Sequence, residues 1–202
     1  MPEWQLILRR DMKSSHFNDK YFTGKRFLRI LPLLVLAVLL LWVNGCRKRE
    51  NVQPVPVRQG WVSDYAKVLT PEEKERITSA LESYEKETCH QIFLLIIPSL
   101  DGEKITDFSK RTATAWHIGQ LGLGNGFLVS IAMKEGSVRI ETGSAFEWFI
   151  QDGTAYTVLK EVIIPLFQQG KFVEGIERGL QEIMTAGRRN PIPENDKPPV
   201  CQ

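Results

Sequence analysis

The sequence predicts an α/β fold: a single three-layer α/β/α domain in which a small mixed sheet is flanked by helices. Two short apolar runs, Gln91–Ile97 and Phe127–Met133, have the length and composition of strands that are buried on both faces. A helical pattern separates them, so the two strands are expected to pair in parallel. After a turn at Lys134–Ser137, Val138–Thr142 alternates apolar and polar side chains. This alternation predicts an antiparallel neighbour with one solvated face, which makes the sheet mixed.

Helices are predicted on both sides of these strands. Thr70 stands at an N-cap position with Glu73 three residues later, which predicts a helix over Pro71–Glu87. A second helix is predicted over Ile105–Ile118, where Gly119 ends it. The chain after Gly143 is predicted to be helical. Ser144 and Asp152 are predicted to be N-caps of two helices, and Pro165 is predicted to restart the chain. The last amphipathic helix is predicted over Phe172–Ile183.

The composition is that of one globular domain with attachments. Of the 202 residues, 43% are hydrophobic and 25% are charged. The net charge of +2 is unevenly distributed: residues 1–45 carry seven Lys/Arg against three Asp/Glu, and residues 46–202 carry nineteen against twenty-one. The mildly acidic remainder has no basic stripe, which argues against nucleic-acid binding. The three cysteines are too scattered for a disulfide framework or a zinc site.

The N-terminal segment has the pattern of an export signal. Basic residues at Lys25–Arg29 precede the apolar run Ile30–Val43. This run is shorter than the roughly 20 residues that a membrane span needs, so a cleaved signal fits its length better. The run ends at Val43–Cys46, which resembles a bacterial lipobox, and Cys46 is therefore the predicted lipidation site. The alternative is an uncleaved anchor that extends from Phe27.

Both alternatives predict a chain tethered to the membrane on the extracytoplasmic, periplasmic side of the cell envelope. The true start, Met1 or Met12, is left open. The predicted organisation is a signal or anchor at 1–45, an extended linker at 46–60, the domain at 61–187 and a disordered tail at 188–202. Whether Cys89 pairs with Cys201 in the tail is also left open.

Seven motifs occur in order between Val62 and Ala186. They are Val62–Thr70, Glu87–Thr88, Pro98–Gly102, Ala115–Gly119, Asn125–Val129, Arg139–Gly143 and Ile164–Phe167. Together they resemble the TPM domain family. The resemblance implies a small sheet between helices in a protein that is exported or membrane-tethered. It also implies divalent-metal (calcium) binding, a role in the repair or assembly of membrane complexes such as photosystem II, and a modest acid phosphatase activity.

The same resemblance suggests a metal site made of Asp64, Asn125 and Asp152. Gly124 stands where the family commonly has an acid, so the expected calcium site is a weak one, because calcium takes about 6–8 oxygen ligands and its affinity depends on their charge. Each ligand has a structural alternative. Asp64 and Asn125 also suit turns, and Asp152 also suits a helix N-cap.

The sequence leaves two functions open, and no catalytic residue is identified for either. The favoured one is a tethered accessory or binding module that serves envelope protein complexes through a protein partner. The alternative is a metal-assisted acid phosphatase. Ser130 lacks the Gly-x-Ser-x-Gly context of a nucleophile, which disfavours a serine hydrolase. Arg139 and Glu141 are interpreted as a solvated face or a cross-strand pair.

Overall fold

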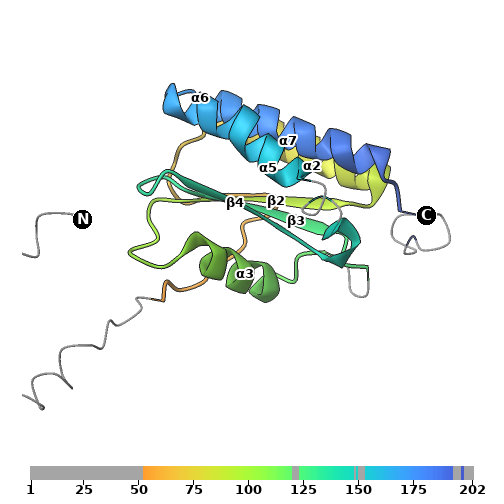
Figure 1. Cartoon of the computed structure of the whole chain (residues 1–202), viewed down its shortest axis with the longest axis horizontal. Coiled ribbons are helices and arrows are strands. Elements are labelled where there is room, and N and C mark those ends of the chain that lie inside the picture. The colour runs from red at the N-terminus through yellow and green to blue at the C-terminus, as the bar shows by residue number, and fades with distance from the viewer. Residues whose placement is uncertain (1–51, 120–122, 148, 150–152, 193–196, 198–202) are drawn as a thin grey trace, which may run out of the picture. The chain divides into compact units, whose positions relative to one another are not determined.

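The computed structural model has three layers (Figure 1). It describes residues 52–119, 123–147, 149, 153–192 and 197. The chain divides into two units, Met1–Arg49 and Glu50–Gln202, and every described residue belongs to the second. One face of the sheet is covered by α2 and by α5–α7, and the other face by α3 (Figure 1). This confirms the predicted three-layer α/β/α class.

The sheet has four strands in the order β1-β2-β3-β4. The strands β2 (Gln91–Ile97) and β3 (Gly126–Ala132) pair in parallel, and β4 (Ser137–Thr142) adds antiparallel to β3, so the predicted mixed sheet is confirmed. The fourth strand, β1 (Val62–Asp64), pairs in parallel with β2. Sequence periodicity did not reveal β1, because three residues are too few to show an alternation.

The two helices next to the strands begin where the sequence predicts. Helix α2 (Pro71–Thr88) starts with a capping box, in which Thr70 accepts from the Glu73 N–H and the Glu73 carboxylate accepts from the Thr70 N–H. Helix α3 (Ile105–Ala115) is shorter than predicted. It ends early because His117 adopts a left-handed backbone conformation with φ of 53°.

The C-terminal third is helical, as predicted. Its elements are η3 (Ser144–Phe146), α5 (Thr154–Thr157), η4 (Val158–Ile163), α6 (Ile164–Gln168) and α7 (Phe172–Arg189). The helix α5 begins after Gly153 at its N-cap. The predicted cap, Asp152, lies outside the described residues.

The prediction that Pro165 restarts the chain is wrong. The helical path runs from η4 directly into α6, and Pro165 lies in the first turn of α6. Pro165 has no N–H to donate to the preceding turn, so a continuous helical path needs that turn to be adjusted. The preceding segment, η4, is a π-helix in which the N–H of Ile164 reaches the carbonyl of Leu159. This wider turn brings the chain into α6 without a break.

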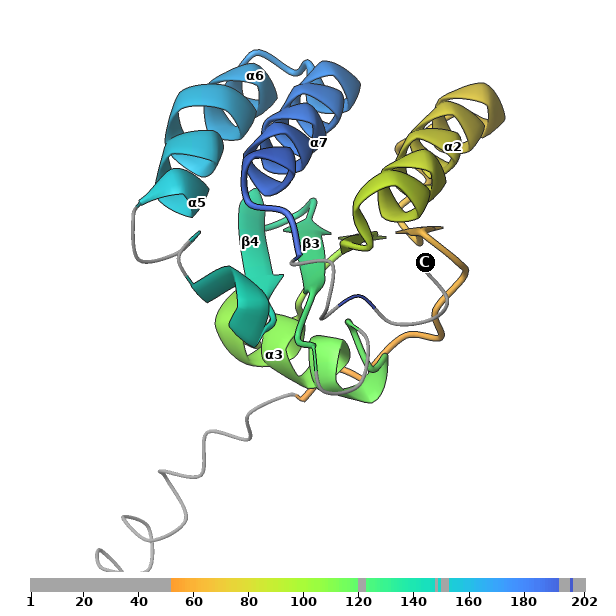
Figure 2. The same cartoon turned by 90° about the vertical axis from the view of Figure 1, so that its right-hand side faces the viewer.

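The sheet separates two apolar cores. Alternate side chains of β2 and β3 point to opposite faces. The larger core lies between the sheet and the helices α2, η4 and α7, and the smaller one lies between the sheet and α3. Figure 2 looks along the strands and shows the helices on the two faces of the sheet, with β4 as one of its outer strands. All seven residues of β3 are buried, which confirms the prediction of a strand covered on both faces.

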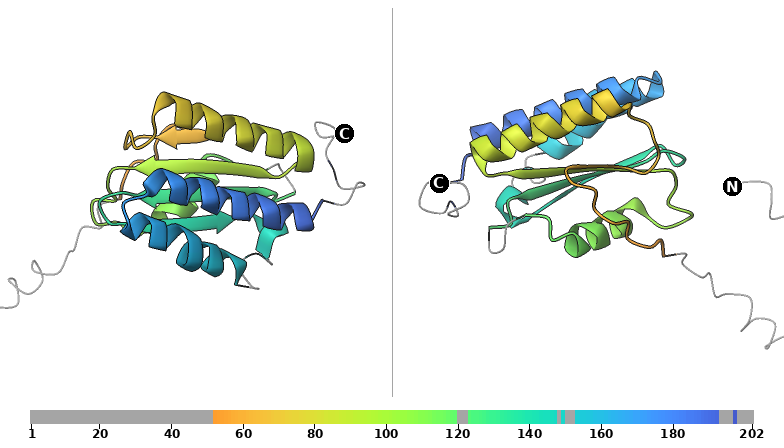
Figure 3. Two further views of the ribbon diagram at one scale, coloured as in Figure 1. Left: turned by 90° about the horizontal axis from the view of Figure 1, so that it is seen from above. Right: turned by 180° about the vertical axis from the view of Figure 1, so that it is seen from behind.

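Residues 52–60, predicted as part of an extended linker, form no helix or strand but are bound to the domain. The side chain of Arg111 donates to the carbonyl of Gln53 at 2.9 Å, and the indole N–H of Trp116 donates to the carbonyl of Pro56 at 2.8 Å. We call residues 52–60 the strap. Figure 3 shows it running past α3. None of the helices within the described ranges is long and apolar enough to cross a membrane.

Candidate functional site

The predicted metal ligand Asp64 ends β1 and holds the turn that follows. Its two carboxylate oxygens accept from the N–H groups of Ala66 at 3.1 Å and Leu69 at 2.8 Å. A carboxylate that accepts from backbone groups two and five residues later stabilises a turn. These contacts match the structural alternative for Asp64 that the sequence left open.

The second predicted ligand, Asn125, is completely buried. Its side-chain amide donates to the carbonyl of Cys89, and its own carbonyl accepts from the N–H of Gln91 at 2.9 Å. Asn125 therefore joins the loop before β3 to the chain between α2 and β2. A buried side chain that bonds the backbone in this way has a clear structural task.

Asp64 and Asn125 lie at opposite ends of the sheet. Asp64 is level with Ile96, whereas Gly126, the neighbour of Asn125, is level with Gln91. Five residues of β2 separate the two levels, which at a strand rise of ~3.3 Å is about 17 Å. Calcium ligands lie about 2.3–2.6 Å from the ion, so one ion cannot contact both side chains.

The expected calcium site therefore does not fit these residues as a set. The third ligand, Asp152, and the lipidation site, Cys46, lie outside the described residues. Within the ranges that the structure describes, no group of three or more His, Cys, Asp or Glu side chains is placed to hold a metal ion.

Gly124 has a structural reason to lack a side chain. Its φ is +60°, and a Cβ built there would lie 2.2 Å from Ser144 Oγ and 2.7 Å from the Ser144 nitrogen. The two segments cross closely, since the Ala145 N–H donates to the Gly124 carbonyl at 3.2 Å. An acid at residue 124 would have to displace Ser144, so this chain cannot regain a carboxylate there without rearranging the start of η3.

The carboxyl end of the parallel strands carries a polar group that the sequence reading missed. Ser99 Oγ lies 2.9 Å from Asp101 Oδ1 and 2.8 Å from Glu135 Oε1. The same Glu135 oxygen accepts from the Leu100 N–H at 3.1 Å. We call Ser99, Asp101 and Glu135 the acidic edge. Sequence alone showed only two loops here, and the register of β2 and β3 brings them together.

Both carboxylates of the acidic edge are held in their ionised form. Hydrogen bonds from Ser99 and then Gln53 lower the pKa of Asp101. Desolvation is the largest single effect on Glu135 and raises its pKa, but the hydrogen bonds from Ser99 and from the backbone N–H groups of Leu100 and Glu135, together with the nearby Lys134 charge, leave the pKa below its ordinary value. The edge therefore stays negative near neutral pH and suits cationic groups of a partner better than a phosphate.

A buried polar pair lies at the other end of the sheet. His90 Nδ1 is 3.1 Å from Tyr84 Oη, and the His90 ring meets the edge of Phe146. Burial lowers the pKa of His90 to about 4 and raises the pKa of Tyr84 to about 12. Both side chains are neutral near pH 7, so neither offers a charge to a substrate. No periodic pattern in the sequence indicates this pair.

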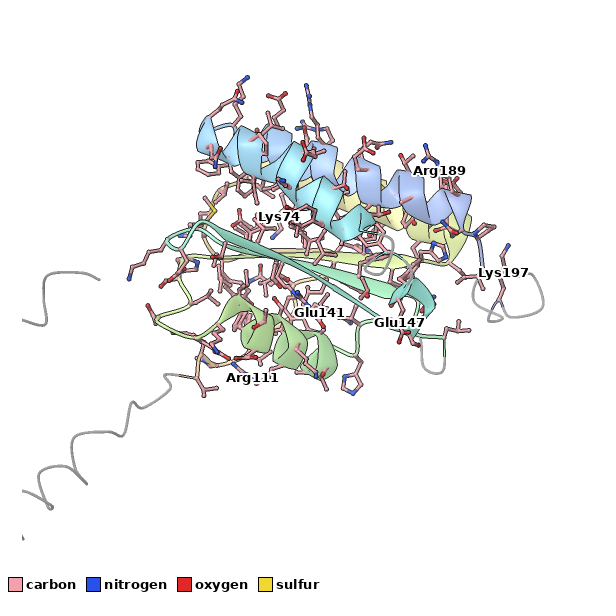
Figure 4. The ribbon with its side chains drawn as sticks, viewed as in Figure 1. Lys74, Arg111, Glu141, Glu147, Arg189 and Lys197 are labelled. Carbon is pink, nitrogen blue, oxygen red and sulfur yellow. The ribbon has the colours of Figure 1, made fainter. Side chains whose placement is uncertain are left out.

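The remaining candidates have structural placements. Ser130 is buried on the α3 side of β3, and its hydroxyl has no hydrogen-bond partner among the described residues, as is also true of Ser109 and Thr112 on α3. Arg139 and Glu141 form an ion pair along β4 with Nε and Oε2 3.0 Å apart. That pair is neither fully solvated nor cross-strand, and Glu141 lies on the α3 side of the sheet (Figure 4).

Cys89 is disulfide-bonded. The other two cysteines of the chain, Cys46 and Cys201, lie outside the described residues. Disulfides form and persist in oxidising compartments and are rare in the reducing cytosol. The bond thus bears on where this protein works.

The chain is similar to known proteins over most of the described region. The model of the TPM domain family matches residues 62–186. A solution structure of the N-terminal domain of a protein from P. gingivalis has 25% identity and a TM-score of 0.58, and the match covers 62% of this chain and 80% of that one. The BA42 protein from the psychrophilic bacterium Bizionia argentinensis has 22% identity and a TM-score of 0.57, covering 66% and 91%.

A third structure supports the same fold. The N-terminal domain of the cg2496 protein from Corynebacterium glutamicum has 17% identity and a TM-score of 0.51, and the match covers 67% of this chain and 84% of that one. No curated protein matches the chain. The family match extends from the first residue of β1 into the last turns of α7, over more than half of the chain. The chain therefore belongs to the TPM domain family.

Proposed function

We propose that this chain is a membrane-tethered, extracytoplasmic accessory module that binds a protein partner during the assembly or maintenance of envelope protein complexes. The observation that carries the proposal is the strap, which continues the predicted export and lipidation segment directly into the domain. It is fixed to α3 by Arg111 and Trp116. A tether that is bound to the domain holds that domain near its anchor.

The reach of this tether is short. Seven residues lead from Cys46 to Gln53, and an extended chain spans at most about 3.6 Å per residue, so the first contact of the strap lies within about 25 Å of the anchor. If residues 46–61 were free, the same arithmetic would allow about 55 Å. The proposed partner is therefore a protein whose exposed part lies close to the membrane.

The chemistry of the domain supports a binding role. The acidic edge carries two carboxylates with lowered pKa values, which suits contact with lysine or arginine side chains. The disulfide at Cys89 supports an oxidising, extracytoplasmic location. Calcium is left out of this proposal, because Asp64 and Asn125 cannot share an ion.

The phosphatase alternative has less support. It needs a metal or cationic groups that stabilise the charge developing on phosphorus. The buried His90 is neutral near pH 7, and the acidic edge would repel a phosphate monoester. Hydrolysis of a generic aryl phosphate by the full chain that is lost in Asp64→Asn, with an unchanged circular dichroism spectrum, would favour this alternative over the binding role.

Crosslinking in cells tests the partner. The full chain is compared with a control that ends at residue 60 and so keeps the anchor and linker without the domain. We expect a protein that is recovered reproducibly by the full chain alone and less by Asp101→Asn with Glu135→Gln. Equal recovery by the full chain and the control would contradict a binding role for the domain.

Peptide mapping without reduction tests the anchor. A thioether-linked lipid on Cys46 excludes that sulfur from a disulfide, so we expect an acylated Cys46 and a peptide in which Cys89 is joined to Cys201. A peptide that joins Cys46 to Cys89 would rule out lipidation at Cys46 and favour the uncleaved anchor.

A further inference from the structure

The strap contacts the domain in the way that a bound peptide contacts a receptor. Gln53 and Val55 each precede a proline, and a residue before proline is biased toward an extended backbone. Pro54 and Pro56 have their own φ angles fixed by their rings. The sequence of the strap therefore restricts it to an extended path, and the structure shows neither helix nor strand there. Such a segment loses little conformational entropy when it binds.

One end of the strap is fixed at Gln53. The Gln53 N–H donates to Glu103 Oε2 at 2.8 Å, and its side-chain Nε2 donates to Asp101 Oδ2 at 2.6 Å. The Gln53 carbonyl accepts from Arg111 Nη2 at 2.9 Å, and Arg111 also pairs with Glu103 at 2.7 Å. The Glu103 side chain is only 7% exposed. Its carboxylate is therefore a largely buried acceptor that Gln53 and Arg111 satisfy together.

The middle of the strap is held through its carbonyl groups. The indole N–H of Trp116 donates to the Pro56 carbonyl at 2.8 Å, and the hydroxyl of Tyr65 donates to the Val57 carbonyl. Val55 packs against the smaller core, whereas the Val57 residue is 80% exposed. Aromatic side chains that bind an extended segment beside its prolines are a recurring mode of peptide recognition. Bonds to carbonyls do not depend on the side chains of the segment, so another extended segment can make them.

The other end of the strap is held by Arg58 and followed by a hinge. The Arg58 guanidinium lies over the Phe93 ring, 5.1 Å from its centroid, and Nη1 donates to the Trp116 carbonyl at 3.3 Å. Gly60 is exposed with a φ of 95°, and no atom lies within 4 Å of the place that a Cβ would take. The strap can therefore swing away at Gly60 while β1 stays in the sheet.

We propose that Tyr65, Phe93, Glu103, Arg111 and Trp116 form a binding site for an extended, proline-containing segment of a partner protein, and that the strap is its resident ligand. We call these five residues the docking face. The strap defines the ligand, which has two prolines separated by one apolar residue and a basic residue two positions after the second proline. The docking face belongs to the region that matches the TPM domain, whereas the strap precedes that region.

A partner segment has to compete with the strap. A short tether gives its ligand an effective concentration of the order of millimolar, so a partner displaces the strap when its own segment is also held close by, as it is beside the membrane. Displacement frees the tether, and its reach rises from about 25 Å to about 55 Å. This assignment rests on the proposed binding role of the domain and names the kind of segment that the domain binds.

Peptide titration tests the site. The probe is a synthetic peptide with the sequence of residues 52–60, blocked at both ends, and the readout is the indole N–H signal of Trp116 in NMR spectra of the full chain in detergent. A variant whose residues 52–58 are replaced by glycine and serine has no competing strap. We expect this variant to bind the peptide with a Kd below about 1 mM, and the parent to bind it about threefold more weakly or less tightly still.

Matched controls test the recognition. A peptide with glycine in place of both prolines should bind the strap variant about threefold more weakly or worse, because it is more flexible when free. Tyr65→Phe and Trp116→Phe, made in the strap variant, each remove one donor to the peptide and keep an aromatic ring. Each should weaken binding about threefold or more, read from the other shifted signals in the case of Trp116→Phe. Lys110→Gln alters an exposed residue of α3 outside the docking face and should leave binding unchanged.

Three results would overturn the proposal. They are no peptide binding up to about 2 mM by a strap variant that keeps the parent's circular dichroism spectrum, equal binding of the proline and glycine peptides, and binding that neither Tyr65→Phe nor Trp116→Phe weakens. If the strap variant does not fold, Gln53→Ala with Arg58→Ala replaces it, since these changes remove side-chain contacts alone. The titration needs neither a membrane nor the partner, so its failure is distinct from a failure of the crosslinking test.

Discussion

Acidification should destabilise this domain through His90. The side chain is 1% exposed, its Nδ1 lies 3.1 Å from Tyr84 Oη, and its ring centroid is 4.6 Å from that of Phe146. Burial holds the pKa of His90 at about 4 in the folded protein, against an ordinary value of 6.5. The unfolded chain therefore takes up a proton at a pH where the folded one does not.

The sign and size follow from this difference. Above pH 6.5 His90 is neutral in both states and contributes no pH dependence. Between pH 6.5 and about 4 the unfolded state binds more protons, so the free energy of unfolding falls as the pH falls. A pKa difference of about 2.5 corresponds to about 3 kcal/mol, at a slope of up to about 1.4 kcal/mol per pH unit. Below pH 4 the contribution of His90 levels off.

Urea unfolding at several pH values between 7.5 and 4.5 measures this effect. His90→Gln should flatten the pH dependence over this window, whereas His117→Gln, which alters an exposed histidine, should leave it close to that of the parent. Glu87, Asp101 and Glu135 have lowered pKa values and add losses of the same sign at the acidic end. The reasoning is refuted if the parent and His90→Gln lose the same stability between pH 6.5 and 4.5.

Two further predictions follow from close contacts. Gly187→Ala places a Cβ 1.9 Å from Tyr84 Oη. We expect a net loss of about 1–3 kcal/mol in the free energy of unfolding, because overpacking exceeds the helix-propensity gain of ~1 kcal/mol. Tyr84→Phe should recover part of this loss, and additive losses from the two substitutions in a double variant would contradict the contact. Arg111→Ala removes the hydrogen bond to Gln53, so limited proteolysis should cut the strap several times faster, and an unchanged rate would show that the strap is held elsewhere.

The strands and the first helix were predictable because their signals are local. The capping box at Thr70 and the apolar runs of β2 and β3 depend on residues within a few positions of one another. The strand β1 and the path through Pro165 were missed because tertiary contacts decide them. Three residues beside β2 become a strand, and a π turn carries the chain past a residue that usually ends a helix.

The site was less predictable than the fold. Asp64 and Asn125 belong to sequence motifs, but their distance depends on strand direction. The strands β1, β2 and β3 run parallel, so the carboxyl end of β1 and the amino end of β3 lie at opposite ends of the strands. The acidic edge was missed for the converse reason, since Asp101 and Glu135 are far apart in the sequence and meet only through the register of two strands. Side-chain chemistry alone does not reveal such proximity.

Membrane association of the full chain tests the central claim most directly. Intact cells that produce it are treated with an external protease, and their membranes are then washed at high pH. Without protease, we predict that the chain stays with the membrane after the wash. In cells whose outer barrier is permeabilised but which are not lysed, we predict that the external protease cleaves it. Release of the whole chain into the soluble fraction, or protection from the protease until the cytoplasm is opened, would contradict a tethered extracytoplasmic module.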